Sequence, residues 1–250
     1  MITPIEIKVN LDGDVAGALR RLRCPDTAAV YRDIWFAEPL HPGTAGAPTL
    51  LSSRIVIRLR SGAEEDDLTV KLRPCVPSQL AGRWGSPFTE PGVRYRIESD
   101  WSADRRMLSA SAISSRPAGS LRAAVARGVD VTGALHSAQR QFLVSCTPPG
   151  VAVDHLRAMG PVASARWTGV PVGTLRADVE RWSTTGLDLV ELSLKVTPQQ
   201  ADSPVDLHLR ALDARRELEA ALRTLGLTIA SGDTKTEQVL TALAAAHRLG

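Results

Sequence analysis

Hydrophobic and polar residues alternate in two neighbouring segments, 54–60 and 68–73. Successive side chains of a strand point to opposite faces, so each segment has one apolar face and one polar face. The polar faces are mainly cationic and carry Arg54, Arg58, Arg60, Lys71 and Arg73. The polar segment 61–67 between them is typical of a hairpin connection. The pattern therefore predicts an antiparallel ribbon with a cationic face, and we interpret the acidic run 64–67 as a solvated hairpin tip.

Similar alternation predicts further strands along the chain, at 5–9, 30–36, 93–101, 162–167, 173–182 and 187–196. A weaker pattern predicts a strand at 139–146 and a helical turn at 153–159. Apolar residues at helical spacing predict helices from 12 or 14 to about 23, at 119–127, at 205–225 and at 234–249. The segment 74–92 is rich in Pro, Gly and Ser and is expected to be a long loop. Its Trp84 has two open interpretations, loop packing or a cover for an organic head group.

The length of 250 residues allows one large core or two modest ones, and all-β barrels often use this length as one domain. We expect one α+β domain spanning residues 1–250, which includes the C-terminal helical part 205–250. The hydrophobic content of 44% and the charged content of 23% are ordinary for a globular protein.

Charge and cysteine content narrow the class of protein. A net charge of +3 is mild and does not favour specific nucleic-acid binding, which usually needs a dense basic stripe. Three cysteines without a CxxC spacing favour free thiols in a reducing compartment. No apolar stretch reaches the roughly 18 residues that a membrane span needs, and no signal region opens the sequence. We expect no membrane partner and a cytoplasmic location.

The polar strand faces suggest a lined cavity rather than a solvated surface. Solvent-facing polar faces are common in antiparallel sheets. Here, however, arginine dominates two adjacent strands, and segment 93–101 places Arg94, Arg96, Glu98 and Asp100 on one face. A sheet closed into a barrel would turn these faces inward. A buried cationic wall needs an anionic guest, which favours a polyphosphate, and the carboxylates would suit Mg²⁺ or Mn²⁺.

Several short motifs, taken in order, resemble the CYTH family, also called triphosphate tunnel metalloenzymes. Glu6-Ile-Lys8 resembles its ExExK signature. Three later segments resemble strands of the family: Arg58-Leu-Arg60 its basic strand, Leu68-Thr-Val-Lys71 its LTxK strand, and Arg96-Ile-Glu98-Ser-Asp100 its RxExE strand. In the second half of the chain, Arg166 resembles a basic residue of the family, and Asp178 and Glu191 resemble its late acidic positions. Lys235-Thr236 resembles the start of its last helix. The resemblance extends from Ile5 to about Leu243.

This resemblance implies an antiparallel eight-stranded β-barrel with flanking helices, a triphosphate tunnel that binds a triphosphate-bearing small molecule. It implies a metal-dependent phosphohydrolase using Mg²⁺ or Mn²⁺, with inorganic, thiamine or nucleoside triphosphate as substrate. The implied phosphate-binding residues are Lys8, Arg58, Arg60, Lys71, Arg96, Arg166 and Lys235. The implied metal ligands are Glu6, Glu98, Asp100, Asp178 and Glu191, and the implied catalytic residues are Glu6, Lys8 and Glu191.

Two departures from the family pattern leave alternatives open. Pro4 stands where the first Glu of ExExK is expected, and Ser193 replaces the second late acid and is followed by Lys195. Fewer carboxylates and one more cation should weaken binding of two metal ions. The alternatives are a non-catalytic polyphosphate or nucleotide binder and a class IV-type nucleotide cyclase. The sequence leaves the oligomeric state open, including a homodimer.

Overall fold

The structure is a computed structural model that describes residues 2–39 and 48–247. By its internal contacts the chain divides into two compact units. The first unit comprises Met1–Tyr31, Glu98–Met107 and Ser164–Lys235. The second comprises Arg32–Ile97, Leu108–Ala163 and Thr236–Gly250.

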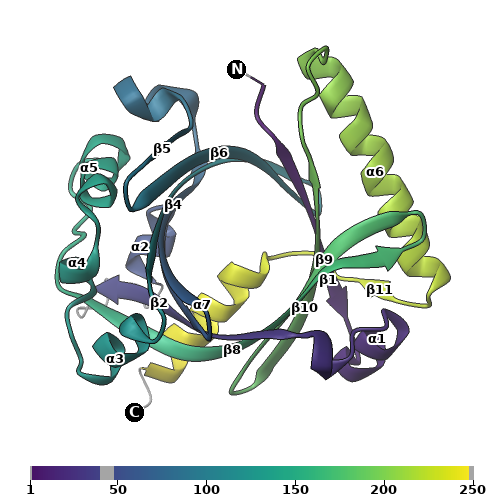
Figure 1. Cartoon of the computed structure of the whole chain (residues 1–250), viewed down its shortest axis with the longest axis horizontal. Coiled ribbons are helices and arrows are strands. Elements are labelled where there is room, and N and C mark those ends of the chain that lie inside the picture. Colours follow the sequence, from purple (N-terminus) through teal and green to yellow (C-terminus); the bar gives the residue numbers. More distant parts are fainter. Residues whose placement is uncertain (1, 40–47, 248–250) are drawn as a thin grey trace. The chain divides into compact units, whose positions relative to one another are not determined.

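Strands dominate the chain, and most of them fall where alternation predicted them (Figure 1). They are β1 (Ile5–Asp12), β2 (Val30–Pro39), β3 (Ile55–Gly62), β4 (Glu65–Cys75), β5 (Phe88–Glu90), β6 (Val93–Ser102), β7 (Arg105–Pro117), β8 (Leu156–Val172), β9 (Leu175–Thr184), β10 (Leu187–Val196) and β11 (Thr228–Ile229). The helices are α1 (Val15–Arg21), α2 (Thr49–Ser52), α3 (Ser120–Ala126), α4 (Val131–Ala134), α5 (Ser137–Cys146), α6 (Pro204–Thr224) and α7 (Lys235–His247).

Hydrogen bonds join the strands in the order β11-β1-β10-β9-β8-β2-β3-β4-β7-β6-β5, and β1 also pairs with β6. The β1–β6 pairing is parallel, whereas β1–β10, β9–β10, β2–β3, β3–β4 and β4–β7 are antiparallel. In the described part of the chain, nine strands therefore close a mixed β-barrel, and β5 and β11 lie outside it.

The α+β class is confirmed, but the expected eight-stranded antiparallel barrel is wrong in strand number and in pairing. The additional strand β7 lies in a segment rich in Ser and Ala, which carries little hydrophobic alternation. The parallel β1–β6 pairing joins strands that are distant in sequence, and no local sequence pattern predicts such a contact.

The first unit buries its apolar strand faces under two helices. Ile7, Val179 and Leu192 are at most 1% exposed and pack with Leu19 of α1 and Leu218 of α6. Figure 1 shows α6 running along the strands of this unit. Because strand side chains alternate, burial of this face directs the intervening charged residues to the opposite face.

The second unit has its own core, which contains an aromatic group. Trp84 is 3% exposed and its ring contacts those of Phe88, Tyr95 and Phe142. The Tyr95 hydroxyl donates a hydrogen bond to the Trp84 carbonyl at 2.8 Å. Trp84 is therefore a packing residue, and its interpretation as a cover for a head group is wrong.

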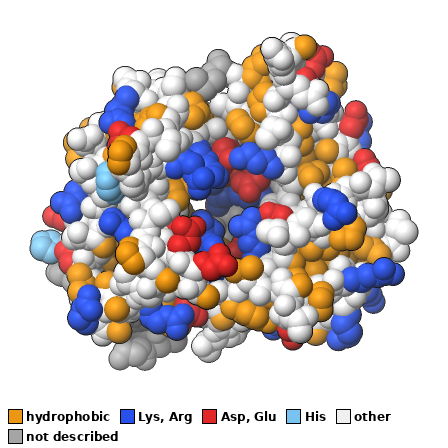
Figure 2. Space-filling view, viewed as in Figure 1, with side chains coloured by type: hydrophobic (Ala, Val, Ile, Leu, Met, Phe, Trp, Pro, Cys, Tyr) orange, Lys and Arg blue, Asp and Glu red, His pale blue; other side chains and the backbone are white. Residues whose placement is uncertain are grey.

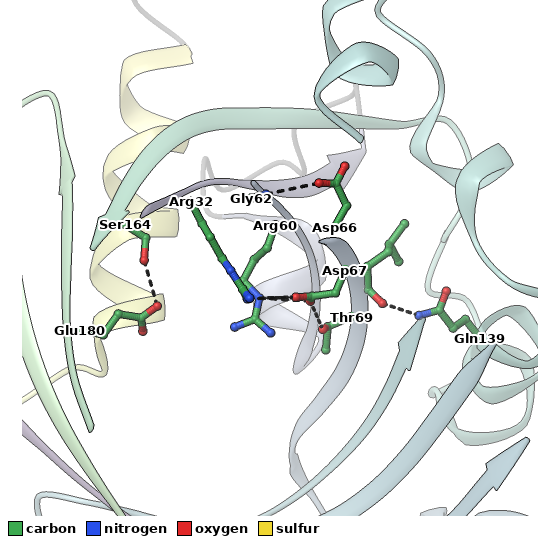
Figure 3. Close-up of polar contacts among 10 residues, drawn as sticks. Arg32, Arg60, Gly62, Asp66, Asp67, Thr69, Gln139, Ser164 and Glu180 are labelled. Atoms are coloured by element: carbon green, nitrogen blue, oxygen red, sulfur yellow. Dashed lines mark hydrogen bonds and ion pairs between the residues drawn. The ribbon is translucent and has the colours of Figure 1, made fainter. Parts of the chain in front are cut away.

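The segment predicted as a strand at 139–146 is instead the helix α5. His136 caps its start, and Gln139 within it is fully buried. The Gln139 amide donates to the carbonyl of Leu68 at 2.8 Å (Figure 3) and to that of Ala112 at 2.9 Å. A short apolar run is ambiguous between helix and strand, and here it follows His136, which forms a helix cap.

Candidate functional site

The polar face of β1, β9 and β10 in the first unit carries three rows of side chains fixed by strand register. Glu6 pairs with Lys195 in the first row. The second row contains Lys8, Ser193 and Asp178, and the third contains Asn10, Glu191 and Glu180. Six of the residues implied by the resemblance or departing from its pattern thus lie on one face: Glu6, Lys8, Asp178, Glu191, Ser193 and Lys195.

Lys8 bridges two carboxylates at the β1–β6 pairing. The register places Glu6 beside Asp100. The Lys8 ammonium lies 2.9 Å from Glu6 Oε2 and 3.5 Å from Asp100 Oδ1. Asp100 is fully buried and the Lys8 side chain is 12% exposed, so this attraction is weakly screened by solvent.

Lys195 forms a second contact of this kind on β10. Its ammonium forms an ion pair with Glu98 of β6, and its backbone register places it opposite Glu6. Pro4 lies beside this group, since its carbonyl accepts a hydrogen bond from Ser99 N–H at 2.8 Å. The cation that departs from the family pattern is therefore in contact with one of the predicted metal ligands.

Arg166 and Asp178 form an ion pair between β8 and β9. The guanidinium donates to Asp178 Oδ2 at 2.6 Å, and the backbone N–H of Gly169 donates to Oδ1 at 2.9 Å. Burial acts to lower the pKa of Arg166, but the hydrogen bond and the charge of Asp178 outweigh it and raise that pKa. Asp178 is thus held by two donors.

Lys235, the first residue of α7, is buried among acidic and aromatic side chains. Its ammonium lies 2.5 Å from Glu180 Oε2, 3.4 Å from Glu191 Oε1 and 4.1 Å from the centre of the Trp182 ring. Glu180 also accepts a hydrogen bond from the Ser164 hydroxyl at 3.0 Å (Figure 3). Sequence reasoning missed Glu180, although its position two residues after Asp178 places it on the same strand face.

The second unit contains the predicted cationic ribbon, β3 and β4. Arg58 lies opposite Thr69, Arg60 opposite Asp67, and Lys71 opposite Val56. Arg32 of β2 also reaches Asp67, with 3.5 Å between Nη1 and Oδ2. We call Arg32, Arg58, Arg60 and Lys71 the ribbon cations; three of them are predicted and Arg32 was missed. Arg96 lies on β6 in the same unit and is half-buried, whereas Arg54 precedes β3 and is exposed.

The acidic run 64–67 is only partly a solvated tip, since Glu64 and Glu65 are exposed but Asp66 and Asp67 are buried. Asp67 is 6% exposed, and Figure 3 shows it accepting from Arg60, Arg32 and the Thr69 hydroxyl. Asp66 is fully buried and accepts from the backbone N–H groups of Gly119 and Leu121 at 3.0 and 2.7 Å. Both residues belong to β4, so the connection is shorter than predicted and only Ala63 and Glu64 lie between the strands.

The predicted metal ligands do not fit a divalent ion as the structure arranges them. Each carboxylate lies within ion-pair distance of a lysine or arginine: Glu6 and Asp100 of Lys8, Glu98 of Lys195, Asp178 of Arg166, and Glu191 of Lys235. Among residues 2–39 and 48–247, no group of three or more His, Cys, Asp or Glu side chains is arranged to hold a metal ion. Hard divalent cations need several oxygen ligands that converge, whereas these carboxylates are held in separate ion pairs.

The charged surface is mixed in sign. In the space-filling view of Figure 2, basic and acidic side chains are interspersed. Of the helices that the structure describes, none combines the length and apolar character needed to cross a membrane.

Comparisons with known proteins identify the fold. A putative adenylate cyclase from Bacillus halodurans matches with a TM-score of 0.53 and 12% identity, covering 95% of this chain and 98% of the other. A putative adenylyl cyclase from Hippeastrum, described as having a dominant triphosphatase activity, matches with a TM-score of 0.52 and 16% identity, covering 94% and 93%. No family model and no curated protein sequence matches the chain. The resemblance to the CYTH family, stated above from sequence motifs, is thus confirmed at the level of the fold.

Proposed function

We propose that this protein binds a triphosphate-bearing small molecule and hydrolyses its terminal phosphoryl group. The observation that carries the proposal is the charge of the ribbon in the second unit. The four ribbon cations lie on β2, β3 and β4, where Asp67 forms ion pairs with Arg60 and Arg32, and Arg60 and Lys71 are half-buried. Arginine binds phosphate oxygens through two parallel hydrogen bonds, and partial burial strengthens each contact.

The likeness in fold to a protein with triphosphatase activity supports the reaction class. Water attacks the terminal phosphorus, its proton passes to a carboxylate, and the bond to the bridging oxygen breaks to release phosphate. Positive side chains stabilise the charge on the phosphoryl oxygens in the transition state. Glu6 and Glu191 remain the proposed proton acceptors, and Lys8, which contacts Glu6, remains the third proposed catalytic residue.

A second candidate function is binding without catalysis, and one observation favours it. All five predicted metal ligands are held in ion pairs by cations of the first unit. A site in which the carboxylates already have partners would keep its phosphate affinity without a metal ion to assist the leaving group.

One experiment separates the candidates. The purified protein is incubated with inorganic tripolyphosphate, thiamine triphosphate and ATP, each with Mg²⁺, with Mn²⁺ and with a chelator, and phosphate and pyrophosphate are measured separately. Phosphate release that Glu6→Gln and Glu191→Gln both abolish supports the hydrolase. Saturable binding without release of either product supports the binder, and pyrophosphate release from ATP would indicate a cyclase. Absence of both binding and turnover for every compound would refute the proposal.

A further inference from the structure

Three carboxylates of the first unit, Glu6, Glu98 and Asp100, lie on two paired strands. Glu6 and Asp100 are neighbours in the β1–β6 register, and Glu98 is two residues before Asp100 and so shares its face. We call these three residues the β1–β6 carboxylates. Asp100 is fully buried and the Glu98 side chain is 13% exposed, so their charges require compensation.

Two lysines already provide that compensation. Lys8 contacts Glu6 and Asp100 at 2.9 and 3.5 Å, and Lys195 forms an ion pair with Glu98. Two ammonium groups together carry the formal charge of one divalent cation. They differ from a metal ion because they are covalently attached and cannot be removed by a chelator.

The backbone explains why Lys195 reaches this group. Its register opposite Glu6 directs its side chain to the polar face of β10, where Glu98 is its partner. A carboxylate at position 195 would instead stand opposite Glu6 and would add a fourth carboxylate to the three β1–β6 carboxylates.

We infer that Lys8 and Lys195 take the place of a divalent cation at the β1–β6 carboxylates, so that the protein binds a triphosphate without a metal ion there. The inference rests on the proposed triphosphate site. Even in the absence of phosphate, the Lys195 ammonium prevents Mn²⁺ from binding to the β1–β6 carboxylates.

The first test measures Mn²⁺ binding to the full chain by electron paramagnetic resonance, with no phosphate present. We expect no stoichiometric Mn²⁺ binding to the unaltered protein and one bound ion in Lys195→Glu. Lys195→Gln removes the charge without supplying a carboxylate and should bind Mn²⁺ more weakly than Lys195→Glu. Arg216→Glu, which makes the same change in net charge on the exposed surface of α6, serves as the control and should bind none. Stoichiometric binding to the unaltered protein, or none to Lys195→Glu, would overturn the inference.

The second test measures tripolyphosphate binding by isothermal titration calorimetry, with and without a chelator. We expect the Kd of the unaltered protein to be the same in both conditions, and the Kd of Lys195→Glu to become dependent on Mn²⁺. Loss of affinity in the chelator would overturn the inference while leaving the proposed function intact. If tripolyphosphate does not bind in either condition, the proposed triphosphate site fails, and the Mn²⁺ measurement still decides the role of Lys195.

Discussion

The Arg60 guanidinium donates from Nε to both carboxylate oxygens of Asp67, at 3.1 Å to Oδ1 and 2.8 Å to Oδ2. The two residues face each other across the β3–β4 register. Asp67 thereby sets the position of one ribbon cation, and it also reaches Arg32. Asp67 thus orients two of the four ribbon cations.

We predict that Asp67→Asn lowers the free energy of unfolding by about 1–3 kcal/mol, because it removes the charge that compensates Arg60 and Arg32 in a poorly solvated place. Urea denaturation measures the change. Glu64→Gln is the matched control, since Glu64 is exposed in the turn between the strands and its loss of charge should leave stability unaltered. Equal midpoints for the two variants would show that the Arg60–Asp67 pair adds nothing to stability.

Asp66 supports a different contact, the start of α3. We predict that Asp66→Ala lowers the free energy of unfolding by about 1–3 kcal/mol, because the N–H groups of Gly119 and Leu121 lose their acceptor. The neighbouring Glu65→Ala is the control, as Glu65 is exposed. Hydrogen exchange of the Leu121 amide should accelerate in Asp66→Ala alone, and unchanged exchange would contradict this role.

These two aspartates show where sequence reasoning stopped. Alternation predicted the apolar and cationic faces of β3 and β4, since a period of two is a local property. It could not assign Asp66 and Asp67 to the interior, because their partners on α3 and β2 are distant in sequence. Likewise, motifs pointed to Glu6, Lys8 and Asp178, but the ion pairs that these residues form depend on strand register, which the sequence does not specify.

Lys235 tests the consequence of removing a buried cation. We predict that Lys235→Met lowers the free energy of unfolding by about 3–5 kcal/mol, because Glu180 and Glu191 would share a buried place without their counter-ion. Adding Glu180→Gln should recover part of this loss. A double-mutant cycle by urea denaturation measures the coupling, and strictly additive effects of the two substitutions would argue against a direct interaction.

The buried thiols predict how stability depends on alkaline pH. Burial raises the pKa of Cys24 and that of Cys146 from 9.0 to about 11. The unfolded chain releases these protons at lower pH than the folded chain. The contribution of the thiols to stability is therefore complete below about pH 9 and is lost as the pH rises toward 11. Urea denaturation between about pH 8 and pH 11 should show this fall, and the double variant Cys24→Ala/Cys146→Ala should show a shallower one. Identical slopes would assign the effect to other groups, such as Tyr95, whose pKa burial also raises.

Substitutions of two ribbon cations should affect phosphate binding more than they affect the stability of the fold. Arg58 and Lys71 lie on the polar face of β3 and β4, opposite Thr69 and Val56 respectively. We predict that Arg58→Ala and Lys71→Ala each weaken tripolyphosphate binding by about tenfold or more, because each removes a charge-assisted hydrogen bond to phosphate. Each should lower the free energy of unfolding less than Lys235→Met does, because Arg58 and Lys71 are half-buried whereas Lys235 is 3% exposed. Calorimetry gives the affinity and urea denaturation gives the stability, with exposed Arg127→Ala as the control. If either variant unfolds readily while the folded fraction still binds tripolyphosphate as before, that residue is structural, and the phosphate-binding surface must lie elsewhere.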